Sequence, residues 1–194
     1  MVQKEKSHTI FDFSTKFNTR NHIIFIKPTI NDDFSIQNLI EFSKGACEKG
    51  LQALKNGAPI LTDTDMAAAA IKSMAENTTR NKVFTASMWF GKNNHTNLTK
   101  TAYGLSEGWK ELSAINSGSK SPIVVIGSSP TALTYLIDIL ENAKDLPSLI
   151  IGMPVGFIGV ENSKNKLIST DLPRIVLNST RGGAAMAAAA VNAL

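Results

Sequence analysis

Short apolar runs alternate with helical stretches in the last third of the chain. Ile123–Ile126 is a continuous apolar run that ends at Gly127, and the pattern after it predicts a helix from Pro130 to Leu140. A run that is apolar at every position is typical of a strand covered on both faces, as in a parallel sheet. The first unit is therefore a buried strand, a turn and a helix.

The same plan occurs twice more before the chain ends. Leu149–Ile151 predicts a second strand, followed by Gly152 and by a helix with Pro154 near its first turn. Arg174–Leu177 predicts a third strand, with Arg181–Gly183 at the turn and a helix reaching Leu194. Pro122, Pro147 and Pro173 each stand just before a strand, where a missing N–H costs little.

The first two thirds predict shorter elements in the same alternation. We expect strands at 22–26, 58–61 and 82–86 and a helix at about 99–112. The pattern from Asp33 to about Lys55 is helical, and Gly45 and Gly50 suggest that it breaks into two pieces.

The segment Thr62–Asp65 resembles a capping box that starts a helix through Met66–Ile71. Asp63 and Asp65 would also suit a paired acid and base, or two metal ligands. The neighbouring hydroxyls of Thr62 and Thr64 favour helix capping.

Strands that alternate with helices predict an α/β fold, a three-layer sandwich with a mostly parallel sheet and helices on both faces. We expect one domain over residues 1–194, with residues 1–21 as a loose arm or an irregular helix. Ligands of such folds bind outside the carboxyl ends of the strands, where all three glycine turns are expected.

Composition narrows the class of protein. The 194 residues are 43% hydrophobic and 19% charged, with a formal net charge of +4. No basic run favours nucleic acid, although a mild positive excess suits a polyanionic small molecule. No apolar run is long enough for a membrane helix, and the first residues lack the apolar core of a signal peptide, so we expect a cytoplasmic protein. The single cysteine, Cys47, is expected to be a buried structural thiol.

Common catalytic patterns are missing from the sequence. His8, His22 and His95 show no metal-ligand spacing, and neither G-x-S-x-G nor G-x-G-x-x-G occurs. His22 opens a predicted strand and has a pKa suited to proton transfer, although a lone histidine there is more often an ordinary surface residue.

All three turns are candidate anion sites. The turn after Gly152 is expected to present bare backbone N–H groups at a helix start, where anionic groups bind well. Gly127, Pro130 and Thr131 belong to a turn that would hold an anion with backbone N–H groups and hydroxyls, or would be a plain connection capped by Ser129. Arg181–Gly183 combines a planar fork of donors with a flexible backbone, which fits either a carboxylate clamp or a surface arginine beside a turn.

Several motifs in one order resemble the precorrin-8X methylmutase family. They lie in Ala53–Met66, in Ile123–Leu133, in Ile151–Phe157 with Glu161, Ser163 and Lys164, and in Arg181–Leu194. The resemblance covers about residues 46–71 and 121–194.

The resemblance implies a homodimeric α/β isomerase that needs no cofactor. It implies a corrinoid substrate with many carboxylates and the transfer of a methyl group from C-11 to C-12 of the ring, giving hydrogenobyrinate or its cobalt form. Positions that match the motifs are expected to bind substrate, and no metal ligand is among them: Thr62, Asp63, Gly127, Pro130, Thr131, Gly152, Pro154, Gly156, Lys164, Arg181 and Gly182.

The sequence departs from the family at the histidine that exchanges a proton with the ring. Aligning the Asp-Phe pair of the family with Asp33–Phe34 places Thr29 at the histidine position, and a threonine hydroxyl does not titrate near neutral pH. Three readings remain: an active methylmutase with His22 as the only nearby replacement donor, a related tetrapyrrole-binding or carrier protein without the reaction, and an unrelated α/β module for another anionic ligand.

Overall fold

The computed structural model describes residues 34–91 and 97–194. The predicted arm at 1–21, the predicted strand at 22–26 and the two candidate catalytic residues, His22 and Thr29, lie outside the described residues.

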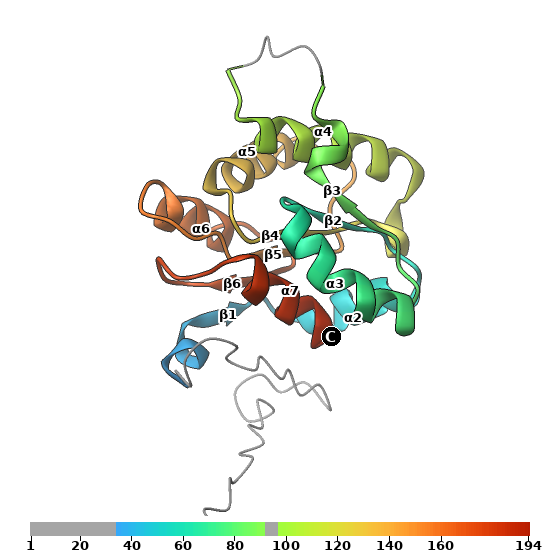
Figure 1. Ribbon diagram of the computed structural model, residues 1–194, viewed down its shortest axis with the longest axis horizontal. Coiled ribbons are helices and arrows are strands. Elements are labelled where there is room, and N and C mark those ends of the chain that lie inside the picture. Colours follow the sequence, from blue (N-terminus) through green and yellow to red (C-terminus); the bar gives the residue numbers. More distant parts are fainter. Residues whose placement is uncertain (1–33, 92–96) are drawn as a thin grey trace, which may run out of the picture.

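One six-stranded sheet runs through the described part of the chain, in the order β1-β6-β5-β4-β2-β3 (Figure 1). Every neighbouring pair is parallel except β1 with β6 at one edge. This confirms the mostly parallel sheet. The strands are β1 (Ile40–Phe42), β2 (Ile60–Thr62), β3 (Val83–Thr85), β4 (Ile123–Ile126), β5 (Leu149–Gly152) and β6 (Arg174–Leu177).

Helices cover both faces of the sheet, as the alternation predicts (Figure 1). One face carries α2 (Ala46–Lys55), α3 (Asp65–Asn77) and α7 (Ala184–Asn192); the other carries α4 (Lys100–Ile115), α5 (Pro130–Leu140) and α6 (Val160–Ile168). Three short 3₁₀ helices complete the described elements: η1 (Phe34–Leu39), η2 (Ala86–Trp89) and η3 (Gly118–Lys120). No helix among these residues is long and apolar enough to cross a membrane.

The apolar strands divide their side chains between two cores. Ile123 and Val125 of β4 pack with α2, α3 and α7, whereas Val124 and Ile126 pack with α4, α5 and α6. Burying each such side chain stabilises the fold by roughly 1.5–3 kcal/mol. The continuous apolar runs are thus explained by burial on both faces.

The helix predicted from Asp33 to Lys55 is wrong in its first half. Ile40–Phe42 is strand β1, which pairs antiparallel with Ile175–Leu177 of β6, so a partner far along the chain overrides the local helical pattern. The expected break does occur at Gly45, whose φ of +72° suits glycine. Gly50 lies inside α2, where a Cβ would come within 2.7 Å of the Leu149 side chain.

The predicted helix through Met66–Ile71 and its capping by a threonine are confirmed, but the cap is Thr64 and the capping box from Thr62 to Asp65 is wrong. Helix α3 begins at Asp65 with Thr64 as its N-cap, the Thr64 hydroxyl accepting from the N–H of Ala67. Thr62 belongs to β2, and its hydroxyl lies 2.9 Å from the carbonyl oxygen of Thr64 and 3.2 Å from that of Phe84. The sequence could not distinguish the two threonines, because the buried strand hydroxyl of Thr62 and the capping hydroxyl of Thr64 belong to the same residue type.

The helix after β5 begins at Val160 and not near Pro154. The Met153 carbonyl accepts the N–H of Gly183, which ties this backbone to another loop instead of to a helix. Gly156 and Gly159 then take φ values of +142° and +72°, which are not helical. The β5–α6 connection is therefore a loop that runs from Met153 to Gly159.

Candidate functional site

The carboxyl ends of β2, β4, β5 and β6 meet at one edge of the sheet. All four strands are parallel, so their following loops gather there, including the three glycine turns predicted from the sequence. We call this region the carboxyl edge. It is the candidate functional site, because ligands of open parallel sheets bind at this end.

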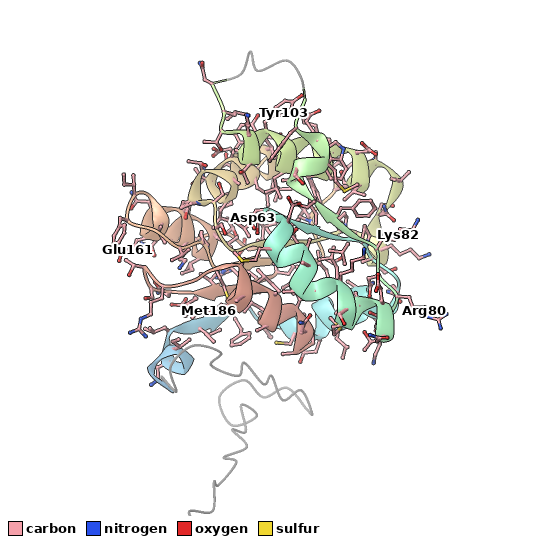
Figure 2. All side chains as sticks on the ribbon, viewed as in Figure 1. Asp63, Arg80, Lys82, Tyr103, Glu161 and Met186 are labelled. Atoms are coloured by element: carbon pink, nitrogen blue, oxygen red, sulfur yellow. The ribbon has the colours of Figure 1, made fainter. Side chains whose placement is uncertain are left out.

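A buried carboxylate holds the first of these turns. Asp63, which directly follows β2, is 2% exposed and lies near the middle of the molecule (Figure 2). One of its oxygens accepts the N–H of Gly127 at 3.1 Å, and the other accepts those of Ser128 at 2.7 Å and Ser129 at 2.9 Å. The side chain thus spans from β2 to the β4–α5 turn.

The Asp63 carboxylate therefore binds the backbone N–H groups of the β4–α5 turn, which the sequence analysis considered as a binding site for a substrate anion. Burial raises the pKa of Asp63 above its usual value, and the hydrogen bonds from the three backbone N–H groups oppose that shift. Ser129 completes the cap, its hydroxyl accepting from the N–H of Ala132. The interpretation of this turn as a capped connection agrees with these contacts.

Hydroxyl groups cluster at the starts of α4 and α5. Thr99 is the N-cap of α4, and its hydroxyl lies 3.2 Å from that of Thr131, which lies 3.1 Å from that of Ser129. Thr131 is exposed, with Pro130 beside it in the first turn of α5. The carboxyl edge thus presents neutral hydrogen-bond donors and acceptors next to the β4–α5 turn that Asp63 holds.

A second buried charge lies on the opposite side of the carboxyl edge. Lys164 of α6 is 0% exposed, and its ammonium donates to the carbonyl oxygens of Ser179 at 2.5 Å and Arg181 at 2.6 Å. Burial lowers the pKa of Lys164 to about 8, and Glu161 in the first turn of α6 partly offsets the change (Figure 2). The ammonium is directed at the backbone of the β6–α7 loop.

Glycines let the loops approach one another closely. A Cβ on Gly182 would lie 2.1 Å from the Met153 carbonyl oxygen, and one on Gly127 would lie 2.6 Å from the Cα of Ala184. Gly152 faces the core, where a Cβ would lie 2.7 Å from Leu167. These three glycines are explained by packing between elements, without any ligand.

The starts of α6 and α7 have glycine N-caps. Their N-caps, Gly159 and Gly183, offer no side-chain hydrogen bond, unlike Ser129 at α5. Arg181 is exposed immediately before α7. Unsatisfied N–H groups and the positive end of the helix dipole favour carboxylates at such places.

The structure brings the predicted site residues to one edge but sorts them by environment. Thr62, Asp63, Gly127, Gly152, Pro154 and Lys164 are buried, whereas Thr131 and Arg181 are exposed and Pro130, Gly156 and Gly182 are intermediate. The buried members build the loops, and the exposed ones are accessible from solvent.

An exposed apolar rim at this edge was missed by the sequence reasoning. Phe157 and Ile158 of the β5–α6 loop are more than nine-tenths exposed, and Met66 and Met88 are about two-thirds exposed. The available signal was two large apolar residues, Phe157 and Ile158, inside a glycine-rich loop.

We predict that Asp63→Asn lowers the free energy of unfolding by about 2–4 kcal/mol, because an amide has one acceptor oxygen and its NH₂ would face backbone donors. Denaturant unfolding measures the change. Asp65→Asn is the matched control: Asp65 is exposed and accepts only hydroxyls, so the loss should stay below about 1 kcal/mol. Equal losses in both variants would contradict the clamp.

Comparisons with known proteins agree on one family. The sequence model of precorrin-8X methylmutase matches residues 27–194. The precorrin-8X methylmutase of Pseudomonas aeruginosa is 38% identical over 166 residues, which are 80% of this chain and 73% of that protein. The cobalt-precorrin-8 methylmutase of Synechocystis is 33% identical over 149 residues, 77% of this chain and 65% of that protein.

A solved structure extends the agreement to three dimensions. The crystal structure of precorrin-8X methyl mutase from Thermus thermophilus superposes with a TM-score of 0.70 at 30% identity, covering 84% of this chain and 78% of that one. The overall fold is thus shared with a solved relative. The chain belongs to the precorrin-8X methylmutase family, a family of isomerases of cobalamin biosynthesis.

Proposed function

We propose that the chain binds precorrin-8X or cobalt-precorrin-8 at the carboxyl edge and catalyses its methyl shift. The observation that carries this proposal is the pair of uncapped helix starts, α6 and α7, beside the exposed Arg181. A corrinoid with many acetate and propionate groups matches several anion positions on one face. Family membership supplies the reaction.

The reaction depends more on how the substrate ring is held than on catalytic side chains of the protein. A methyl group leaves C-11 of the ring and forms its new bond at C-12, so that substrate and product are isomers and no cofactor is consumed. The chain's part is to hold the macrocycle through its carboxylates and to exchange a proton with the ring. Arg181 and the starts of α6 and α7 hold the macrocycle.

The proton exchange has no assigned donor among the described residues. All three histidines of the sequence, His8, His22 and His95, lie outside them. Thr29 stands where the family has its histidine, and a positioned acid contributes about 10²–10⁴-fold in rate. We propose that the chain turns over slowly, driven by binding and ring distortion.

Incubation with precorrin-8X, followed by absorption spectroscopy, tests this function. We expect catalytic formation of the hydrogenobyrinate spectrum, and Arg181→Gln should weaken product binding about 10–100-fold by removing a charged hydrogen-bond donor. Arg80→Gln is the matched control, an exposed arginine after α3 and away from the carboxyl edge (Figure 2). Tight stoichiometric binding without turnover would favour a carrier, and no binding would reject both functions.

Restoring the family histidine tests the assignment of the donor. Thr29→His should raise turnover about 10²-fold or more, with product affinity changed little, because the new imidazole adds proton transfer and no binding contact. Single-turnover kinetics separate the two effects. If His22→Ala abolishes the wild-type turnover, His22 is the donor and Thr29 is the wrong position.

We further propose that the chain is a homodimer that buries the exposed part of the β5–α6 loop. Val155, Phe157 and Ile158 expose large apolar surface within four residues. Exposed apolar patches of this kind mark interaction sites, and an isologous contact would pair the loop with the same face of a second copy.

Sedimentation equilibrium checks the dimer. Phe157→Ser combined with Ile158→Ser should shift the protein from dimer to monomer, because the interface loses its apolar centre. Ile115→Ser is the matched control, since Ile115 is 73% exposed at the end of α4 and lies outside this loop. A monomeric wild type at tens of micromolar, or equal effects of both changes, would refute the proposed surface.

A further inference from the structure

Lys164 has the largest fully buried side chain among the described residues. Lys164 is a residue of α6, and its ammonium contacts Ser179 and Arg181 of the β6–α7 loop, which lie 15 and 17 residues further along the chain. An ammonium out of water is costly unless its donors are engaged. Two short hydrogen bonds to backbone carbonyls supply that engagement.

These contacts hold the backbone of Arg181 from several sides. The Arg181 carbonyl accepts from Lys164, and its N–H donates to the Ser179 hydroxyl at 3.2 Å. Two residues on, the N–H of Gly183 donates to the Met153 carbonyl at 2.9 Å, with Gly182 pressed against the same carbonyl. Lys164 thereby fixes the loop that carries the exposed Arg181 side chain.

The contacts also remove Lys164 from the group of substrate ligands. Its side chain has no exposed surface, and its ammonium already meets two carbonyl oxygens. We infer that Lys164 is a positioning residue: it holds the Ser179–Gly183 backbone so that Arg181 meets a substrate carboxylate, and it does not touch the substrate itself. This inference rests on the proposed function of Arg181.

Positioning differs from general stabilisation in how Lys164 and Arg181 combine. If Lys164 acts through Arg181, removing the arginine leaves Lys164 little to contribute to binding. Changes at two independent sites would instead multiply their effects on the dissociation constant. A double-variant comparison therefore separates the two roles.

The test measures hydrogenobyrinate affinity for Lys164→Met, Arg181→Gln and the double variant, each shown to be folded. We expect Lys164→Met to weaken binding about tenfold or more, and the double variant to bind no more than about threefold more weakly than Arg181→Gln alone. Lys166→Met is the matched control, because Lys166 lies on the same helix but pairs with Asp138, and its affinity should not change. Unchanged affinity in Lys164→Met, or fully multiplicative losses, would overturn the inference.

Hydrogen exchange of the Ser179–Gly183 loop is a second test. It requires neither the ligand nor a Lys164→Met variant that folds. The amides of Arg181 and Gly183 should be protected in the wild type and should exchange at least tenfold faster in Lys164→Arg, whose planar head does not fit the two-carbonyl site. Unprotected amides in the wild type would overturn the inference. If the wild type binds no corrinoid, the proposed function fails, while a protected loop that loosens in Lys164→Arg still shows that Lys164 holds Arg181.

Discussion

The carboxylate of Asp63 joins the end of β2 to the start of α5, and the carboxyl edge depends on this contact. A buried charge is tolerated only with partners, and here the partners are three consecutive backbone N–H groups. Hydrogen bonds to a charged group contribute about 1.5–3 kcal/mol each, so the set outweighs any single apolar contact in the region. The turn keeps its shape without a ligand.

One consequence concerns where a ligand can bind. The N-terminus of α5 is usually counted among the anion sites of such a sheet, but an internal carboxylate already satisfies it. The starts of α6 and α7 have glycine N-caps, and the proposed function places substrate carboxylates there. Lys164 fixes the loop before α7 with a charge of the opposite sign. Two buried charges, Asp63 and Lys164, thus hold the loops of the carboxyl edge.

Much of this fold was predictable because its signals are local. The bounds of β4 and α5 follow from an apolar run, a serine cap and a proline at the first helical turn. Strand β1 was missed because its partner β6 lies more than 130 residues away, and nothing in Ile40–Phe42 announces that pairing. The location of the site at the carboxyl edge was predictable from the glycine turns, whereas the partner of Asp63 was not. That partner requires knowing that β2 lies beside β4, and strand order is not written in any local pattern.

The proposed function thus assigns binding and proton transfer to different parts of this chain. The proposed function assigns carboxylate binding to backbone N–H groups and to Arg181, which lie in loops held by Asp63, Lys164 and close glycine contacts. The proposed function assigns proton transfer to a single side chain, for which the sequence alignment offers the position of Thr29. Replacing one titrating group removes a factor of about 10²–10⁴ in rate. An intramolecular methyl shift begins with its reacting atoms already joined in one molecule, so what the protein adds is the shape in which the ring is held. If Thr29 stands at the donor position, the chain keeps the part that holds the ring and loses only the factor that proton transfer contributes.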